Sequence, residues 1–362
     1  MTALGDGTVQ WYHGVSDART HREAELLAAG CPLPARARNA WARAFPRINS
    51  SLLVVEGGGA IAAIGFERHA SRALPGHHIA RVQRAGASVP PDTEAMLASA
   101  IVAEARRDRR TLRVQVECFS RDEEARGRIG VALRSHGFAP IPDPTNYGYT
   151  LATDLGGRDN ASHLASLSQG VRQNIRAVAK YPVELRPIHD ASDSPRMNAL
   201  MHETLGRTGA THVERDYAPV IALANAEPGL SRLVGLYRTD GASADALIAF
   251  AWGLNNVDHV AYDIGASGRV PEFKSLSLGY PLLWDLIAWA RDLGASWFDY
   301  GGVPADDVDA AHLERISDFK RRFEKQSVRV AEEWVLTPHP ARAAVASAVS
   351  RAASVLSRRR TR

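Results

Sequence analysis

The chain has 362 residues, of which 45% are hydrophobic and 23% charged, and its formal net charge is +4. This composition is typical of a globular protein with room for two domains, and it excludes a collagen-like or largely disordered chain. The two cysteines form no motif, so neither a disulfide framework nor a zinc site is supported. No apolar run approaches the roughly 20 residues of a membrane-spanning helix, and the N-terminal residues lack signal-peptide features, so we expect a cytoplasmic protein.

The first half of the chain alternates strands and helices. Residues 1–46 are interpreted as a helical or irregular lead-in, and a hairpin turns at Gly57-Gly58-Gly59. The remaining predicted elements are strands at 51–56, 60–66, 79–83, 111–117 and 147–154 and helices at 92–108 and 122–136. We therefore expect a first domain at 47–160, with a central mixed sheet flanked by helices.

A basic helix is predicted next, at 169–180. Arg172, Arg176 and Lys180 are spaced at i, i+4 and i+8, so they share one helical face, while Val171 and Ile175 fall on the adjacent face and pack inward. Three cations in a row suit a phosphate-bearing ligand, because arginine binds phosphate oxygens bidentately. A solvated helix face is the alternative interpretation.

The second half is predicted as a domain at 161–338. Its helices are expected at 195–206, 217–225 and 280–293, its strands at 231–237, 246–254, 259–265, 296–300 and 328–336, and a Phe-Lys segment at 316–325. The tail at 339–362 contains six arginines and no acidic residue. Its interpretations are a disordered solvated tail or a weakly amphipathic helix that contacts RNA or, peripherally, an anionic membrane surface.

Three motifs in these segments resemble the Fem family of peptidoglycan bridge-forming aminoacyltransferases. They are Trp297-Phe-Asp-Tyr-Gly-Gly302, Asp318-Phe-Lys-Arg-Arg-Phe323 and Arg172-Gln-Asn-Ile-Arg176. The resemblance covers roughly residues 50 to 336 and lacks the long coiled-coil insertion that some members use on tRNA. It implies an α/β (α+β) chain with two tandem acetyltransferase-like (GNAT) domains, the first on the acceptor side and the second on the donor side.

The candidate catalytic residues lie in the second domain. His202-Glu203 lacks the second histidine of a zincin and no Gly-x-Ser-x-Gly elbow is present, so we expect neither a metal enzyme nor a serine hydrolase. Acyl transfer to an amine requires removal of a proton, stabilisation of an oxyanion and alignment of the reactants. Asp299 and Tyr262 are candidates for proton transfer. In the other interpretation Asp299 caps Gly301-Gly302 and Tyr262 belongs to the core.

Lys320 is the preferred catalytic residue, since the family resemblance implies that the lysine of the Phe-Lys pair lies near the transferred group. A solvated charge is the alternative. Phe319 then shapes the pocket. The full set of predicted substrate-binding residues is Phe319, Arg172, Arg176, Lys180, Tyr300 and Lys274.

The donor is the most open part of the prediction. Simple acetyltransferases hold the pyrophosphate of acyl-CoA in a glycine-rich loop, whereas residues 269–279 contain one late glycine. We therefore expect aminoacyl-tRNA as donor, acyl-CoA as alternative, and no tightly bound cofactor or metal. The expected acceptor is an amine of an envelope precursor or a small metabolite. The hypothesis from another class is a non-catalytic protein that binds a nucleotide-sugar or RNA.

Overall fold

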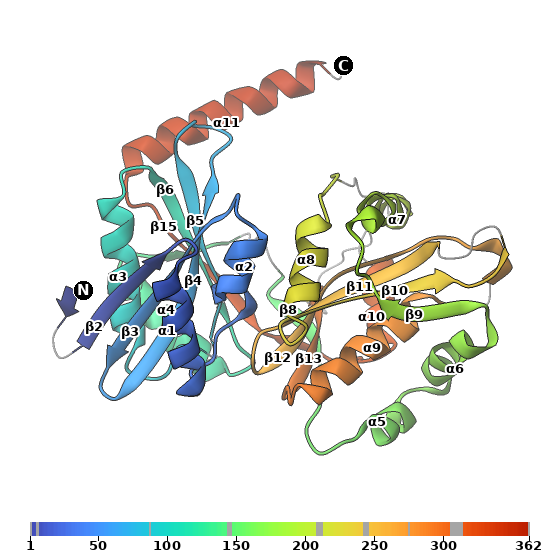
Figure 1. The fold of residues 1–362 in the computed structure, drawn as a ribbon. Helices are drawn as coiled ribbons and strands as arrows, with labels where there is room; N and C mark the ends of the chain where they lie inside the picture. The colour runs from blue at the N-terminus through green and yellow to red at the C-terminus, as the bar shows by residue number, and fades with distance from the viewer. Residues whose placement is uncertain are drawn as a thin grey trace. The chain divides into compact units, whose positions relative to one another are not determined.

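The computed structural model describes residues 2–4, 7–86, 88–142, 147–207, 213–241, 246–273, 276–304 and 314–360. The chain divides into two compact units, the first made of Met1–Asn146 and Val330–Arg362 and the second of Tyr147–Arg329. Each unit contains a mixed sheet with helices packed on it (Figure 1). Within the described residues, every helix is too short or too polar to cross a membrane.

The first unit is built on an eight-stranded sheet with the order β1-β2-β3-β4-β5-β6-β15-β7. Its strands are β1 (Thr2–Leu4), β2 (Gly7–His13), β3 (Asn49–Gly57), β4 (Ala60–Ala70), β5 (His78–Gly86), β6 (Thr111–Phe119), β7 (Ala139–Pro140) and β15 (Ala331–Leu336). Its helices are α1 (Asp17–Ala28), α2 (Asn39–Ala44), α3 (Glu94–Arg107), α4 (Glu123–Ser135) and α11 (Pro340–Arg360).

Both faces of this sheet are covered. Leu53 and Val55 of β3 pack in one apolar cluster with residues of α3 and α4, whereas Leu52 and Val54 pack in another with Leu26 of α1. This alternation follows from the two-residue period of a strand. The predicted hairpin is confirmed as β3 and β4, with Gly58 and Gly59 at φ of 59° and 80° in its turn. The structure thereby explains why glycine is needed there.

The predicted lead-in at 1–46 is instead part of the first unit. Strand β2 pairs antiparallel with β3, and Arg19 of α1 is fully buried. Its guanidinium donates hydrogen bonds to the carbonyl oxygens of Gly14 at 2.9 Å and Ala37 at 3.0 Å. Because a buried cation needs such acceptors, Arg19 ties the whole N-terminal segment to the sheet.

The second unit is built on a seven-stranded sheet with the order β14-β8-β13-β12-β11-β10-β9. Its strands are β8 (Tyr149–Asp154), β9 (Val183–Pro187), β10 (Ser231–Arg238), β11 (Leu247–Asn255), β12 (His259–Ser267), β13 (Trp297–Val303) and β14 (Ser327–Arg329). Its helices are α5 (Asn160–Ser166), α6 (Gln169–Ala177), α7 (Ser194–Gly206), α8 (Ala218–Ala226), α9 (Gly279–Asp292) and α10 (Glu314–Arg321).

Helices α7 and α8 cover one face of this sheet, and α6 and α9 lie on the other (Figure 1). Helix α9 packs so closely on β11 that a Cβ at Gly253 would lie 3.1 Å from a methyl group of Leu286. The helix ends as predicted, with Gly294 at a φ of 74° after its last turn. Val171 and Ile175 of α6 are buried in the same cluster as α9, as their spacing predicts.

Three boundaries differ from the predicted ones. The strand predicted at 147–154 in the first domain belongs to the second sheet, where it pairs with β13 and β14. The single strand predicted at 328–336 is wrong, because β14 pairs with β8 in the second sheet and β15 pairs with β6 in the first. The chain therefore returns to its first unit at Val330, earlier than the predicted boundary at 338.

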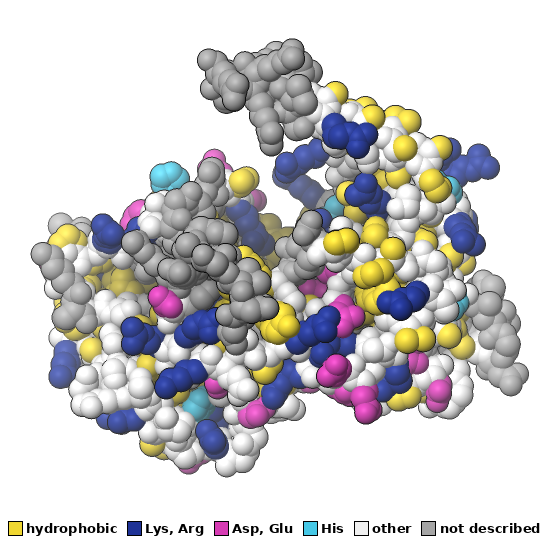
Figure 2. Space-filling view, turned by 180° about the vertical axis from the view of Figure 1, so that it is seen from behind, with side chains coloured by type: hydrophobic (Ala, Val, Ile, Leu, Met, Phe, Trp, Pro, Cys, Tyr) yellow, Lys and Arg dark blue, Asp and Glu magenta, His cyan; other side chains and the backbone are white. Residues whose placement is uncertain are grey.

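The tail is a helix in the structure, not a disordered segment. Ala343 and Ala346 of α11 are buried, and the Arg342 guanidinium donates to the carbonyl of Arg109. Val345 and Val349 remain 54% and 42% exposed, so apolar and basic side chains share the free surface of this helix (Figure 2).

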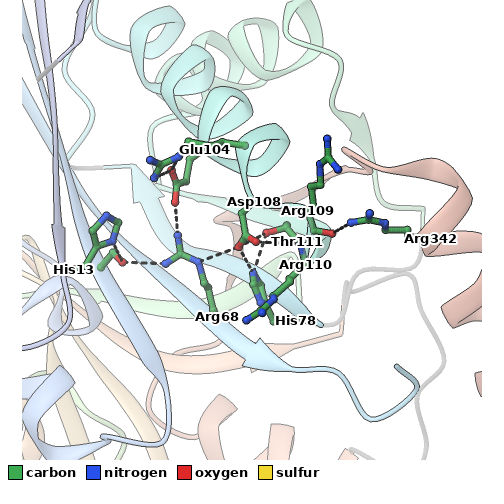
Figure 3. A network of polar contacts seen from close by, with 11 residues as sticks. His13, Arg68, His78, Glu104, Asp108, Arg109, Arg110, Thr111 and Arg342 are labelled. Atoms are coloured by element: carbon green, nitrogen blue, oxygen red, sulfur yellow. Dashed lines mark hydrogen bonds and ion pairs between the residues drawn. The ribbon is translucent and has the colours of Figure 1, made fainter. Parts of the chain in front are cut away.

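A buried polar network connects β3, β4 and α3 in the first unit (Figure 3). The Arg68 guanidinium donates to Glu104 Oε1 at 2.6 Å and Ser51 Oγ at 3.0 Å, and its Nε lies 3.8 Å from Asp108 Oδ2. Asp108 also lies 2.9 Å from Nε2 of His78. Burial lowers the pKa of His78, although the Asp108 carboxylate opposes this shift. Arg68 is thus the buried cation of this network, in contact with both carboxylates.

We expect Arg68→Met to lower the free energy of unfolding by about 3 kcal/mol or more, because it leaves buried Glu104 without its buried partner. Arg107→Met is the matched control: Arg107 also donates to Glu104, at 2.6 Å, but is 71% exposed, so its loss should cost less than about 1 kcal/mol. Urea denaturation measures both. Equal effects of the two substitutions would contradict this account of the network.

Candidate active site

Two parallel strands of the second unit separate at their carboxyl ends. Strand β12 pairs with β13 only from His259–Ala261 to Trp297–Asp299, and the strands diverge beyond these residues. A register shift between Trp252 and Gly253 distorts the pairing of β11 with β12 beside this point. The gap between β12 and β13 therefore lies at Tyr262 and Asp299, the two residues predicted for proton transfer.

A pocket of about 790 Å³ lies in the second unit at this opening. Most of its lining is apolar, with Met201, Phe250, Ile264, Leu276, Leu282 and Phe319 among the contributors. Among the lining residues, the charged side chains are Arg207, Asp263, Arg269 and Lys320. Such a pocket, apolar with few polar groups, is typical of a small-molecule or cofactor site.

Lys320 lies in this lining and is only 7% exposed. It comes from the last turn of α10 and donates a hydrogen bond to the carbonyl oxygen of Gly302 at 3.1 Å. Burial lowers the pKa of Lys320 to about 8, while the negative charge of Asp299 opposes that shift. The pocket therefore contains a buried amino group whose pKa lies closer to neutral pH than that of a free lysine.

Asp299 is 1% exposed and holds the turn that supports Lys320. Its Oδ1 accepts hydrogen bonds from Thr150 Oγ1 at 2.5 Å and from the Gly301 amide at 2.8 Å. Gly301 has a φ of 80°, which a residue with a Cβ rarely adopts. A Cβ at Gly302 would lie 2.5 Å from the ring of Tyr147. Asp299 thus caps the Gly-Gly turn and positions the lysine electrostatically, rather than lining the pocket.

The predicted aromatic residues fall into two groups. Tyr262 and Phe319 line the pocket, and the Phe319 ring packs edge-on against Tyr280 with centroids 5.2 Å apart. Burial raises the pKa of Tyr262, so its hydroxyl stays protonated. Tyr300 is fully buried in the aromatic core, where its hydroxyl lies 3.0 Å from Thr153 Oγ1. Tyr300 therefore supports the sheet and is not among the residues that line the pocket.

The basic helix is separate from the pocket lining. The Arg172 guanidinium donates to the carbonyl oxygens of Ala165, at 3.0 Å, and Leu167, so it caps the end of α5. Arg176 and Lys180 are exposed. The helix approaches the pocket loop through Asn174, whose Oδ1 accepts a weak hydrogen bond from the Ser277 amide at 3.4 Å. The geometry does not bring the three cations to Lys320.

Some backbone amides at the start of α9 bond within the protein. The amides of Leu276 and Tyr280 donate to the carbonyls of Phe273 and Ser277, and Pro281 has no amide hydrogen. A Cβ at Gly279 would lie 2.9 Å from the Phe319 ring. Helix N-termini bind phosphate through free amides, and the Tyr280 hydrogen bond and the Phe319 ring occupy part of this one. Lys274, predicted nearby as a phosphate contact, lies outside the described residues.

Comparison with known families gives a match in the same region. Residues 165–321 match the model described as "Acetyltransferase (GNAT) domain". The second unit is a GNAT-type acyltransferase domain. Its divergent strands and pocket are the features that the fold needs for acyl transfer. A comparison with curated protein sequences finds no significant match.

Several solved structures match most of the chain in fold. FemX matches with a TM-score of 0.65 and 14% identity, over 82% of this chain and 91% of its own. L-PGS from Bacillus licheniformis matches with a TM-score of 0.54 and 11% identity, over 94% and 97%. The C-terminal domain of a putative lysylphosphatidylglycerol synthetase from Agrobacterium fabrum matches with 0.53 and 13%, over 92% and 96%. The Fem-like fold of two tandem GNAT-like domains is thereby confirmed.

Two residues that line the pocket, Arg207 and Arg269, are not among the predicted site residues. Arg207 follows α7 and Arg269 follows β12, so each stands at the end of an element. Arg207 Nη2 donates to the carbonyl oxygen of Ser267 at 2.9 Å, which joins the two element ends. Sequence spacing contains no signal for this contact, because 60 residues separate its partners. Only the packing of α7 on β12 brings them together.

We expect Asp299→Asn to lower the pKa of Lys320 further below about 8, because the substitution removes the negative charge that favours the ammonium. Asparagine retains an oxygen that accepts the Thr150 and Gly301 hydrogen bonds. NMR titration of ¹⁵N,¹³C-labelled lysine side chains follows the resonance, assigned with Lys320→Met. Asp263→Asn is the control from the same pocket and should leave the pKa of Lys320 unchanged. A rise of this pKa in Asp299→Asn would refute the electrostatic role of Asp299.

Proposed function

We propose that the protein transfers an aminoacyl group from aminoacyl-tRNA to an amine of an envelope precursor or a small metabolite. The observation that carries this proposal is the Lys320 ammonium, buried in an apolar pocket at the separation of β12 and β13. In the reaction the amine nitrogen forms a bond to the carbonyl carbon, the ester C–O bond breaks, the amine loses a proton and the leaving oxygen gains one.

The pocket residues have distinct parts in this mechanism. The Lys320 ammonium donates a hydrogen bond to the carbonyl oxygen as negative charge develops on it, an interaction that is stronger in an apolar pocket than in water. The Tyr262 hydroxyl, which is protonated before the reaction, supplies a proton to the leaving oxygen, and the proton that the amine loses then restores the hydroxyl. Asp299 is a positioning residue: it holds the Gly301-Gly302 turn against the lysine and favours its charged form.

Two observations support an aminoacyl donor. At the start of α9 the Tyr280 amide is bonded to Ser277 and the Phe319 ring packs on Gly279, which reduces the space for the pyrophosphate of acyl-CoA. In addition, two of the similar structures are FemX and a putative lysylphosphatidylglycerol synthetase, whose name describes an aminoacyl product. The second candidate is an acyl-CoA-dependent N-acyltransferase, which the acetyltransferase description of the matched family favours. Both candidates use the same Lys320 pocket.

The first unit and α11 are proposed to serve the acceptor. In the first unit, the parallel strands β5 and β6 pair as far as Gly86 and Phe119, with a register shift between Val82 and Ala85, so within the described residues they do not diverge as β12 and β13 do. The sequence after Pro340 contains six arginines and no acidic residue, and this positive charge complements the phosphates of an envelope precursor or of an anionic membrane surface. Arg172 and Arg176 add positive charge on α6 of the second unit.

We expect Lys320→Met to lower kcat at least about 100-fold, as loss of one oxyanion donor does in other acyl transfers. Lys325→Met, which removes an exposed lysine five positions later, is the matched control and should retain activity. Transfer of a radiolabelled acyl group from charged tRNA and, separately, from acetyl-CoA to an amine library measures both variants and identifies the donor. Circular dichroism and melting temperature confirm folding.

The outcomes separate the hypotheses. Transfer from charged tRNA that requires Lys320 supports the aminoacyl function, whereas transfer from acetyl-CoA alone favours the second candidate. Binding of RNA or a nucleotide-sugar without transfer, and without any effect of Lys320→Met, would instead support a non-catalytic binding protein.

A further inference from the structure

Helix α11 packs on the first sheet through small residues and leaves its larger apolar residues outside. Ala343 and Ala346 are buried where the helix lies on β6. Val345 and Val349, spaced i and i+4 on one face, are exposed. Exposed alanines continue along the helix: Ala341, Ala344, Ala348 and Ala352. The apolar face of a surface helix is ordinarily the one that it buries, whereas in α11 it is open to solvent.

Polar contacts fix this orientation of the helix. The Arg113 guanidinium of β6 donates to Ser347 Oγ at 3.0 Å, and the Arg342 guanidinium donates to the carbonyl oxygen of Arg109. Ser347 therefore faces β6. Val345 precedes it by two residues, which is about 200° around a helix, so the valine is directed away from the sheet. The contacts that hold α11 on the first unit thus also place its valines outside.

Arginines from two segments of the first unit lie beside this open face. The turn between α3 and β6 and the start of β6 supply three exposed ones, namely Arg109, Arg110 and Arg113. Arg342 of α11 contacts the same turn (Figure 3). The carboxylate of the turn is directed to other groups, since Asp108 Oδ2 lies 3.8 Å from Arg68 Nε and 2.9 Å from His78 Nε2. Positive charge therefore accompanies the exposed apolar residues of α11.

We propose that α11, together with the turn that carries Arg109 and Arg110, binds the surface of an anionic phospholipid bilayer. The helix lies in the plane of the membrane. Its open apolar face enters the boundary between headgroups and acyl chains, and the guanidinium groups contact lipid phosphates. This surface uses no residue of the Lys320 pocket, so membrane binding goes beyond the proposed transfer and does not depend on it.

The composition of the face favours a bilayer over nucleic acid. Proteins usually hold single-stranded RNA by cations together with aromatic side chains on which the bases stack. Residues 340–360 contain no aromatic residue. Exposed valines gain from the removal of their apolar surface from water, which a bilayer provides and a phosphate backbone does not. Because two valines bury little area, we expect binding that needs both the apolar contact and the positive charge.

Vesicle sedimentation of the full-length protein tests this surface. Vesicles of equal parts phosphatidylglycerol and phosphatidylcholine should bind at least about 10-fold more tightly than vesicles of phosphatidylcholine alone, and added salt should weaken that binding. Val345→Asp should lower binding to the anionic vesicles at least about 10-fold, because it places a carboxylate on the face that enters the membrane. Val131→Asp is the matched control: it replaces a valine of α4 that is 70% exposed and should bind like the wild type.

A second pair of variants tests the positive charge. The double variant Arg109→Gln, Arg110→Gln should weaken binding to the anionic vesicles at least about 5-fold, because two guanidinium groups no longer meet lipid phosphates. The double variant Arg43→Gln, Arg47→Gln removes the same charge from exposed positions of the first unit outside this face. It should retain most of the binding.

Equal binding of the wild-type protein to both kinds of vesicle, or equal binding of Val345→Asp and Val131→Asp, would overturn the membrane surface. Retention of tRNA without vesicle binding would also overturn it and assign the arginines to nucleic acid. A dimer in solution that Val345→Asp dissociates, again without vesicle binding, would assign the valines to a second copy of the chain. None of these measurements uses an acyl donor, so their failure leaves transfer by Lys320 unaffected, and a failure of transfer leaves vesicle binding unaffected.

Discussion

The burial of one ammonium group, that of Lys320, is the constraint on which the second unit depends. Removing a lysine from water is unfavourable, and two features of the Gly301-Gly302 turn offset part of that cost: a carbonyl oxygen 3.1 Å away and the charge of Asp299. Asp299 in turn requires Thr150 from β8 and the Gly301 amide. The strand β13, the strand β8 and the helix α10 must therefore all be in place before the lysine is stable.

This dependence explains why the Gly-Gly turn and the Phe-Lys pair occur together. Gly301 supplies a positive φ that turns the backbone toward Lys320, and Gly302 leaves room for the ring of Tyr147. Phe319 packs on Gly279 at the start of α9 and so fixes α10 on the other side of the lysine. The Gly301-Gly302 turn and the Phe319-Lys320 pair therefore act together, because both are needed to hold the buried lysine in place.

The sequence predicts local features well and pairing partners poorly. The helix at 123–135 begins at Asp122, whose carboxylate accepts the Glu124 and Ala125 amides, and this cap is visible in the sequence. By contrast, residues 327–336 alternate as one strand would, because the two-residue period is the same whichever sheet a strand joins. The exchange of sheets near Val330 is decided by distant partners. The motif names Lys320, which the structure places in the pocket lining, whereas the contact of Arg207 with Ser267 depends on tertiary packing alone.

The two units show how one fold acquires a pocket or remains closed. In the first unit, β5 and β6 are parallel like β12 and β13, but despite a register shift between Val82 and Ala85 they are paired again at Gly86 and Phe119. A Cβ at Gly86 would lie 1.8 Å from the carbonyl oxygen of Phe119, so glycine there brings the two backbones together. In the second unit the pairing stops after Ala261 and Asp299, and bulky side chains such as Tyr262 follow. Gly86 ends β5 where the two strands of the first unit are paired, whereas Tyr262 of β12 follows the point where the strands of the second unit separate. The buried Lys320 lies at that separation.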